Sequence, residues 1–121
     1  MNPNYVFVFG SNLAGRHGAG AAAFAYKHYG AVMGKGIGHV GNSYGIPTKD
    51  QNLYVLELNE IAIYIQEFLD YARRNPDLIF ALTPVGCGLS GFSPSDIKPI
   101  LKRYVIPVNV VLTKEWITDY E

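Results

Sequence analysis

Apolar residues along the chain follow two spacings, one typical of strands and one typical of helices. Continuous or alternating apolar runs predict strands over residues 5–9, 78–83 and 108–113. A shorter run over residues 42–46, stopped by Pro47, predicts one more strand. Four strands are therefore expected, and none of them is adjacent in sequence to the next.

Between these strands the spacing of apolar residues is helical. The clearest helix carries an apolar stripe at intervals of three and four residues from Leu58 to Ala72. We expect Asn59 to cap its start and Pro76 to end it. An alanine-rich second helix is expected over residues 18–29.

A third helix is expected near Ser93, which with Asp96 resembles a capping box. Because Pro99 would interrupt such a helix, the better fit has Asp96 as the cap and a helix over residues 97–104. Residues 31–41 contain too much glycine for a regular helix and are expected to form a mobile flap.

The order strand, helix, strand, helix, strand, helix, strand predicts an α/β fold. Its sheet is expected to be mostly parallel, with helices on both faces. The 121 residues are enough for one domain with its own core. In such sheets ligands bind beyond the carboxyl ends of the strands.

Glycine-rich loops follow two of the predicted strands and precede helices. The first glycine loop (residues 10–20) reads GSNLAGRHGAG, and the second glycine loop (residues 83–92) reads TPVGCGLSGF. Backbone N–H groups in such loops converge at the positive end of a helix and bind phosphate. The pair indicates a ligand with more than one phosphate, or with a phosphate and a sugar, although glycines also serve turns and close packing.

Two common phosphate motifs do not fit these loops. Residues 18–23 match the dinucleotide pattern G-x-G-x-x-A, but residues 10–17 separate them from the strand, and no acid lies about 20 residues further on. The segment Gly34–Gly36 contains a lysine but lacks the hydroxyl residue of a P-loop. These absences disfavour an NAD-dependent dehydrogenase and a P-loop ATPase.

Charge is distributed unevenly along a chain whose net charge is zero. Residues 1–49 hold four Lys and Arg residues and all three histidines, and the first carboxylate is that of Asp50. Such a segment favours an anionic ligand. It has too few basic residues for a groove that binds a nucleic-acid duplex.

The remaining composition favours a cytoplasmic protein without cofactor or metal. Cys87 is the only cysteine, which fits a reducing compartment, and no apolar run approaches the roughly 20 residues of a membrane helix. The N-terminus has no basic region of the kind that begins a signal peptide. The histidines show no spacing typical of a zinc site.

The two loops, in this order, resemble those of the macrodomain superfamily of ADP-ribose-binding modules. The resemblance lies in Asn12, in the Gly18–Ala22 turn, in the Tyr44–Lys49 segment and in Gly86–Gly91. It is closest to the terminal ADP-ribose glycohydrolase-like branch. The resemblance implies a three-layer α/β/α fold with a mixed, mostly parallel sheet.

The same resemblance implies a ligand, either ADP-ribose or an ADP-ribosylated protein. In the family the second loop wraps the diphosphate and distal ribose, and the first approaches from the other side. An aromatic side chain, Phe92 or Phe24, can stack on ribose or adenine, although core packing is the expected role of Phe24. The ligand-binding residues implied are Gly10, Ser11, Asn12, Gly18, Ala19, Gly20, Thr48, Gly86, Cys87, Gly88, Leu89, Ser90, Gly91 and Phe92.

For catalysis, Lys49 occupies the position of the lysine that attacks the anomeric carbon in the glycohydrolase-like branch. The assisting acid of that branch is replaced by Ser90, and only Asp50 and Asp96 are nearby substitutes in sequence. Two functions therefore stay open. One is an ADP-ribose-binding module that can also hydrolyse ADP-ribosyl linkages, and the other is a non-catalytic protein that binds or sequesters a nucleotide.

Overall fold

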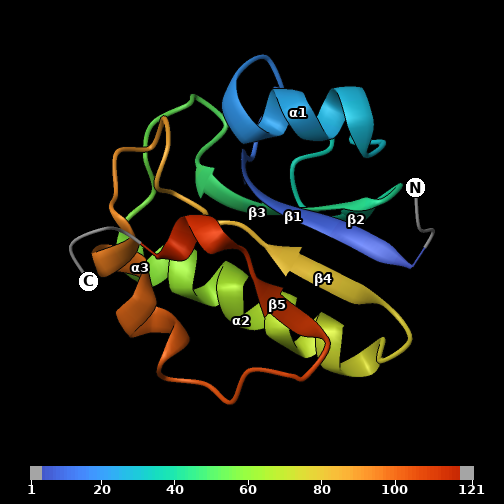
Figure 1. Cartoon of the computed structure of the whole chain (residues 1–121). Helices are drawn as coiled ribbons and strands as arrows, with labels where there is room; N and C mark the ends of the chain where they lie inside the picture. The colour runs from blue at the N-terminus through green and yellow to red at the C-terminus, as the bar shows by residue number, and fades with distance from the viewer. Residues whose placement is uncertain (1–3, 118–121) are drawn as a thin grey trace.

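A computed structural model of the chain describes residues 4–117 as a sheet with helices packed against it (Figure 1). The elements in chain order are β1 (Tyr5–Asn12), α1 (Gly20–His28), β2 (Gly38–Val40), β3 (Ser43–Lys49), α2 (Leu58–Arg74), β4 (Ile79–Leu82), α3 (Pro94–Leu101), β5 (Val110–Leu112) and the short 3-10 helix η1 (Lys114–Trp116).

The sheet has five strands in the order β2-β3-β1-β4-β5, with β1 at its centre. Strand β2 runs antiparallel to β3, and every other neighbouring pair is parallel. The predicted α/β class and the mostly parallel sheet are therefore confirmed. Parallel strands bring their carboxyl ends to one edge, which is where both glycine loops begin.

Strand β1 separates two apolar clusters because its side chains alternate between the faces of the sheet. Val6 and Val8 belong to the large cluster formed with α2 and α3. Phe7 and Phe9 pack in a smaller cluster with the buried alanines of α1. Helix α1 thus covers one face and α2 and α3 cover the other, as Figure 1 shows.

Two strands run further than the apolar runs predicted. Strand β1 continues past Phe9 to Asn12 because Gly10–Asn12 pair with the end of β3. Strand β3 passes through Pro47 to Lys49, so the expected stop at Pro47 is wrong. Pro47 is tolerated because β2 pairs only with Ser43–Gly45. Within residues 4–117 the outer side of β3 therefore has no partner strand at Pro47.

Residues 31–41 contain an element that the sequence did not predict, the edge strand β2. The segment is fixed to the first glycine loop at several points. His17 is buried, and its Nε2 donates to the carbonyl oxygens of Val32, at 3.0 Å, and of Lys35, at 3.2 Å. Ser11 donates its hydroxyl to Gly36 O. A mobile flap without regular structure was expected over residues 31–41, and this expectation is corrected for residues 38–40, which form a strand.

Helix α2 buries the apolar stripe that the sequence predicted, but its cap is different. Glu57 is the N-cap, in a capping box with Glu60, so the expectation of Asn59 is wrong. Glu60 reaches back to accept the Glu57 backbone N–H at 3.3 Å, which satisfies a group that the helix leaves unbonded. Among residues 4–117, no helix has the length and apolar character to cross a membrane.

Helix α3 follows the first of the two sequence interpretations. Ser93 is its N-cap in a capping box with Asp96, whose Oδ2 accepts the Ser93 backbone N–H at 2.9 Å. The preferred alternative, with Asp96 as the cap, is therefore wrong. Pro99 lies inside the helix. Because it has no N–H, the helix loses the one hydrogen bond that residue 99 would donate to the carbonyl of Ser95 in the first turn.

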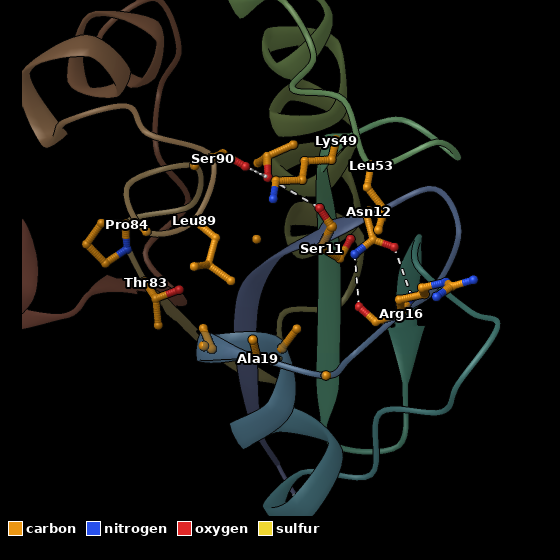
Figure 2. Close-up of a pocket in the computed structure, with 18 residues that line it drawn as sticks. Ser11, Asn12, Arg16, Ala19, Lys49, Leu53, Thr83, Pro84, Leu89 and Ser90 are labelled. Atoms are coloured by element: carbon orange, nitrogen blue, oxygen red, sulfur yellow. Dashed lines mark hydrogen bonds between the residues drawn. The ribbon is translucent and has the colours of Figure 1, made fainter.

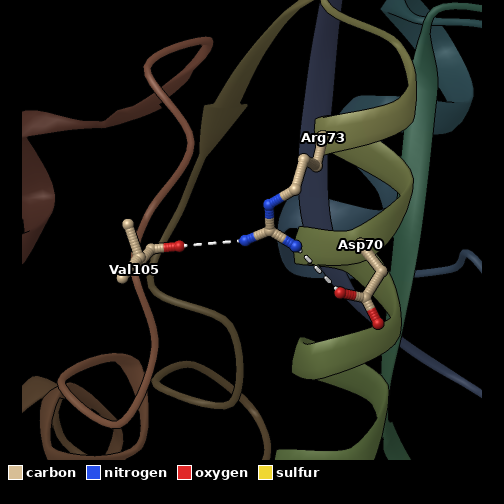
Figure 3. A network of polar contacts seen from close by, with 3 residues as sticks. All are labelled: Asp70, Arg73 and Val105. Carbon is tan, nitrogen blue, oxygen red and sulfur yellow. Dashed lines mark hydrogen bonds and ion pairs between the residues drawn. The ribbon is translucent and has the colours of Figure 1, made fainter.

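On its exposed side, α2 is joined to the segment after α3 through one arginine (Figure 3). Arg73 donates to the Asp70 carboxylate at 3.0 Å and to Val105 O at 3.1 Å. Exposed ion pairs of this kind contribute little to stability, at most about 1 kcal/mol. The bond from Arg73 to Val105 O fixes the tertiary structure, because it joins α2 to a segment that is distant in sequence.

Candidate functional site

A cleft of about 490 Å³ opens at the carboxyl ends of β1, β3 and β4 (Figure 2). This volume lies within the range of roughly 300–1000 Å³ found for small-molecule sites. The strand ends form its floor, the start of α1 forms one wall, and the second glycine loop forms the opposite wall. Its position agrees with the general rule for ligands of parallel sheets.

Helix α1 directs its positive end at the cleft, and neither its N-cap nor its first turn supplies a side chain that would neutralise this end. Its N-cap is Ala19, which cannot cap through its side chain, and its first turn contains no acid. The first bond back along the helix joins Ala23 N to Ala19 O at 3.2 Å, so the N–H groups of the preceding turn have no acceptor within the helix. Such a helix end attracts anions.

The second glycine loop is folded into consecutive tight turns. Cys87 N donates to Pro84 O at 3.1 Å in the first turn, and Gly91 N donates to Gly88 O at 3.0 Å in the second. Phe92 N then closes the loop by donating to Gly86 O at 2.9 Å. Gly86 has a φ of +79°, a conformation that favours glycine. The tip of the loop, from Gly88 to Ser90, lines the cleft.

Close packing joins the second loop to the floor of the cleft. A Cβ added at Gly10 would lie 3.1 Å from Gly86 N, so glycine at this position lets the loop rest on β1. The hydroxyls of Thr48 and Ser90 lie 2.8 Å apart. Leu89, at the exposed tip, lies on the α1 side of the cleft, because a Cβ added at Gly20 would be 3.7 Å from its Cδ1.

The charged residues that line the cleft are both cations. They are Arg16 and Lys49, and the lining, which lies wholly within residues 10–90 of the described chain, includes no carboxylate. The Asn12 side chain fixes the turn before α1: its Nδ2 donates to Arg16 O and its Oδ1 accepts Arg16 N, each at 2.9 Å. The Asn12 side chain therefore holds the backbone of Arg16 in place and so positions Arg16 at the cleft.

The two acids considered as substitutes for the missing catalytic acid have other partners. Asp50 Oδ1 accepts the N–H groups of Asn52, at 2.8 Å, and Tyr54, at 3.0 Å, which closes the turn after β3. Asp96 caps α3. Neither lines the cleft. Lys49 does line it, and in Figure 2 its side chain extends towards Ser90.

No family model matches the sequence, and comparisons with curated proteins and with solved structures give no match. The functional argument therefore depends on the site itself. In residues 4–117, no group of three or more His, Cys, Asp or Glu side chains is placed to hold a metal ion.

Most of the residues implied by the resemblance converge on this cleft. The members that line it are Gly10, Ser11, Asn12, Gly18, Ala19, Gly20, Thr48, Lys49, Gly86, Gly88, Leu89 and Ser90. Three others do not. Phe92 packs against the large core, Gly91 lies at an exposed turn, and Cys87 faces a neighbouring hollow.

The position of Cys87 makes it a poor nucleophile. Burial, together with the negative charge of Asp96, raises the pKa of its thiol to about 11. Its Sγ lies 3.6 Å from Val85 O, to which the protonated thiol donates. The thiolate needed for nucleophilic attack is therefore scarce at neutral pH.

Several cleft residues are not among the ligand-binding residues expected from the sequence, although three of them belong to the two glycine loops. They are Arg16, Ala21, Ala22, Leu53, Thr83 and Pro84. Thr83 and Pro84 follow β4 directly. They could have been predicted from the sequence, because ligands of parallel sheets bind beyond the carboxyl ends of the strands. Leu53 could not have been predicted in this way, because only the turn closed by Asp50 brings it to the cleft. In this turn Leu53 has a φ of +68°.

Proposed function

We propose that the cleft binds ADP-ribose, or a closely related nucleotide, through its diphosphate. The observation that carries the proposal is the cleft between the α1 N-terminus and the second glycine loop, lined by Arg16 and Lys49 and by no carboxylate. A diphosphate requires several donors at once, and the two walls offer backbone N–H groups from opposite sides.

The sugar portions of such a ligand also find suitable partners. Thr48 and Ser90 contribute hydroxyl groups beside Lys49, and ribose hydroxyls both donate and accept hydrogen bonds. Ala19, Leu53 and Leu89 add apolar surface to the cleft. This mixture of a mainly apolar lining with a few polar groups is typical of small-molecule sites.

The resemblance to macrodomains suggests which nucleotide binds, namely ADP-ribose, and which branch of the family the chain is most similar to, namely the terminal ADP-ribose glycohydrolase-like branch. On this proposal the chain has a three-layer α/β/α fold of macrodomain type and acts in the cytoplasm on free or protein-linked ADP-ribose. The arrangement of the layers, with α1 opposite α2 and α3, is consistent with it. A non-catalytic protein that sequesters another nucleotide is the alternative, and it would use the same anion-binding walls.

Hydrolysis of an ADP-ribosyl linkage is a second candidate function, favoured by the position of Lys49. Its side chain lies at the cleft beside the Thr48–Ser90 pair. There its neutral amine can attack the anomeric carbon of the distal ribose and break the bond from that carbon to the modified group, after which water releases ADP-ribose from the lysine. Within residues 4–117 the lining supplies no carboxylic acid for the leaving group. Turnover is therefore expected to be slow compared with an enzyme that has one.

Isothermal titration calorimetry with ADP-ribose, ADP, NAD, cyclic AMP and ribose 5-phosphate tests the binding proposal. We expect ADP-ribose to bind most tightly and Arg16→Ala to weaken it about three- to tenfold, as for loss of a charged hydrogen bond. Lys27→Ala is the matched control, since Lys27 is a cation of the same segment at the far end of α1 and does not line the cleft. If ADP-ribose produced neither heat nor a change in melting temperature, the proposal would be wrong.

A further inference from the structure

Strand β5 forms one edge of the sheet, and within residues 4–117 it has a partner strand on one side only (Figure 1). The edge of a sheet presents backbone N–H and C=O groups to which a strand of another chain can bond. Most proteins protect such an edge with a charged side chain, a proline, a bulge or a covering segment. The residues of β5 decide whether this edge is protected.

The chain around β5 is apolar and uncharged. Residues 104–113 read YVIPVNVVLT, so ten consecutive residues carry no charge, and Pro107 lies before the strand rather than in it. Val108 is fully exposed, Val111 is 52% exposed and Leu112 is 45% exposed. Valine and leucine therefore stand where a protected edge carries lysine or another charged residue.

The opposite edge of the sheet, formed by β2, has a different character. It begins with Gly38, whose φ of +86° is not a conformation of a regular strand. It continues with His39, a polar residue whose Nδ1 lies 2.6 Å from Tyr71 Oη. Of the two edges, β5 is the one that offers apolar side chains to a partner.

The backbone groups of β5 that point away from the sheet follow from those that point into it. Asn109 O accepts an N–H of β4 at 2.8 Å, and Thr113 N donates to a carbonyl of β4 at 3.1 Å. Because the direction alternates along a strand, the backbone groups of Val110 and Leu112 point outward. Val110 N already donates to Pro107 O at 3.1 Å. The outward groups left for another strand are Val110 O and both backbone groups of Leu112.

We propose that two copies of this chain pair antiparallel along β5, about a two-fold axis at Val111. In this register Leu112 N of each copy donates to Val110 O of the other, and the two Val111 side chains meet at the axis. A second copy fits because it presents the same uncharged side chains and, in reverse order, the matching donor and acceptor. The net charge of the chain is zero, so two copies do not repel each other.

Sedimentation velocity between about 2 and 500 µM tests the association. The contact is short, so we expect a dimer that dissociates on dilution, with a Kd of about 10–100 µM. Val111→Lys places two cations at the axis and should weaken the dimer at least about tenfold. Ile63→Lys is the matched control, because Ile63 is an exposed apolar residue of α2 rather than of the edge, and it should keep the wild-type Kd.

The proposed backbone bond is tested at Leu112. Leu112→Pro removes the N–H that donates across the axis, and proline is tolerated where the N–H of an edge strand faces outward. Leu112→Ala is its control, because it shortens the side chain but keeps the N–H. We expect the proline variant to dimerise at least about fivefold more weakly than the alanine variant. Equal Kd values for the two would contradict the register.

A disulfide test locates the axis. In a Cys87→Ser background, Val111→Cys should form a covalent dimer with oxidised glutathione, because facing Cα atoms at such a position lie about 4.5 Å apart, within reach of a disulfide. Val108→Cys is the control. It is fully exposed, but in this register its two copies lie about 20 Å apart and should not be linked.

The remaining outcomes are decisive in the same way. A wild type that stays monomeric up to about 500 µM overturns the proposal, and so does a dimer that Val111→Lys leaves intact. Assemblies larger than a dimer would show that β5 pairs with a different edge and that the contact does not close, which also overturns it. Because β5 does not line the cleft, Val111→Lys should bind ADP-ribose like the wild type, so this proposal and the cleft proposal fail separately. Melting temperatures show whether each variant keeps the fold.

Discussion

The hydroxyl groups of Thr48 and Ser90 lie 2.8 Å apart, and this bond joins the carboxyl end of β3 to the second glycine loop. Thr48 is buried, at 3% exposure, and its Oγ1 also lies 3.3 Å from Ser11 O, which can only accept. The Thr48 proton is therefore directed to Ser11, and Ser90 donates to Thr48. The bond keeps one wall of the cleft at a fixed distance from its floor.

A double-mutant cycle measures this bond. We expect Thr48→Val and Ser90→Ala each to lower the free energy of unfolding, with a coupling of about 0.5–1.5 kcal/mol, typical of a neutral hydrogen bond. Urea denaturation of the two single variants and the double variant gives the value. Strict additivity of the two changes would show that the bond does not contribute to the folded state in solution.

A second prediction concerns the close approach of residues 31–41 to the first glycine loop. A Cβ added at Gly36 would overlap the carbonyl of Asn12, whose carbon would lie 2.9 Å away. Gly36→Ala should lower the free energy of unfolding by about 1–3 kcal/mol, as overpacking does. Gly18→Ala is the control, because a Cβ there meets nothing within 4 Å, and it should be nearly neutral in denaturation. Equal stability of the two variants would contradict the packing described here.

The third prediction follows from the pKa of Cys87, which is raised to about 11. Only the thiolate reacts with iodoacetamide, so labelling should be slow at pH 7.5 and rise about tenfold per pH unit without a plateau below pH 10. Because the folded protein keeps this proton longer than the unfolded chain, stability should also fall between about pH 9 and 11. Mass spectrometry follows the labelling, with Cys87→Ser as the blank. A plateau near pH 8 would show an ordinary or activated thiol.

A fourth prediction separates binding from hydrolysis. If Lys49 attacks the anomeric carbon, Lys49→Ala should reduce release of ADP-ribose from an ADP-ribosylated protein at least about hundredfold, the scale of losing a catalytic group. Lys35→Ala removes an exposed cation of the same segment, one that does not line the cleft, and should retain wild-type turnover. Turnover that survives in Lys49→Ala would remove Lys49 from the mechanism. No release by the wild type would rule out hydrolysis of that linkage and leave only the binding proposal, which calorimetry tests.

Much of the architecture was predictable because it follows from local rules. The stripe of α2 marks the helix and its buried face, since a helix repeats every 3.6 residues. The alternation in β1 sends Val8 to one face and Phe9 to the other, and the chain order predicts a mostly parallel sheet. Capping was less predictable. Glu57 was missed because a Glu–Glu box is uncommon compared with a Ser, Thr, Asp or Asn cap.

The edge strand β2 was not predictable from pattern, because it has only three residues and begins with Gly38, a residue type that is depleted in strands. Its pairing depends on β3 being present beside it and on glycines that let backbones approach, such as Gly45 against Gly36 O. The extension of β3 through Pro47 has the same origin, since it depends on which side of the strand lacks a partner.

The sequence by itself determined that two glycine loops follow strands, that the first 49 residues carry cations and no acid, and that both loops meet at one edge of a parallel sheet. These are properties of short segments, which local chemistry encodes. The tertiary structure decided which residues meet across the chain. It placed Arg16 and Lys49 in one cleft, packed Phe92 against the core and brought Glu115 to a hollow that residues of α1 also line. Such encounters depend on how layers pack and on which backbones approach closely, and no local pattern specifies them.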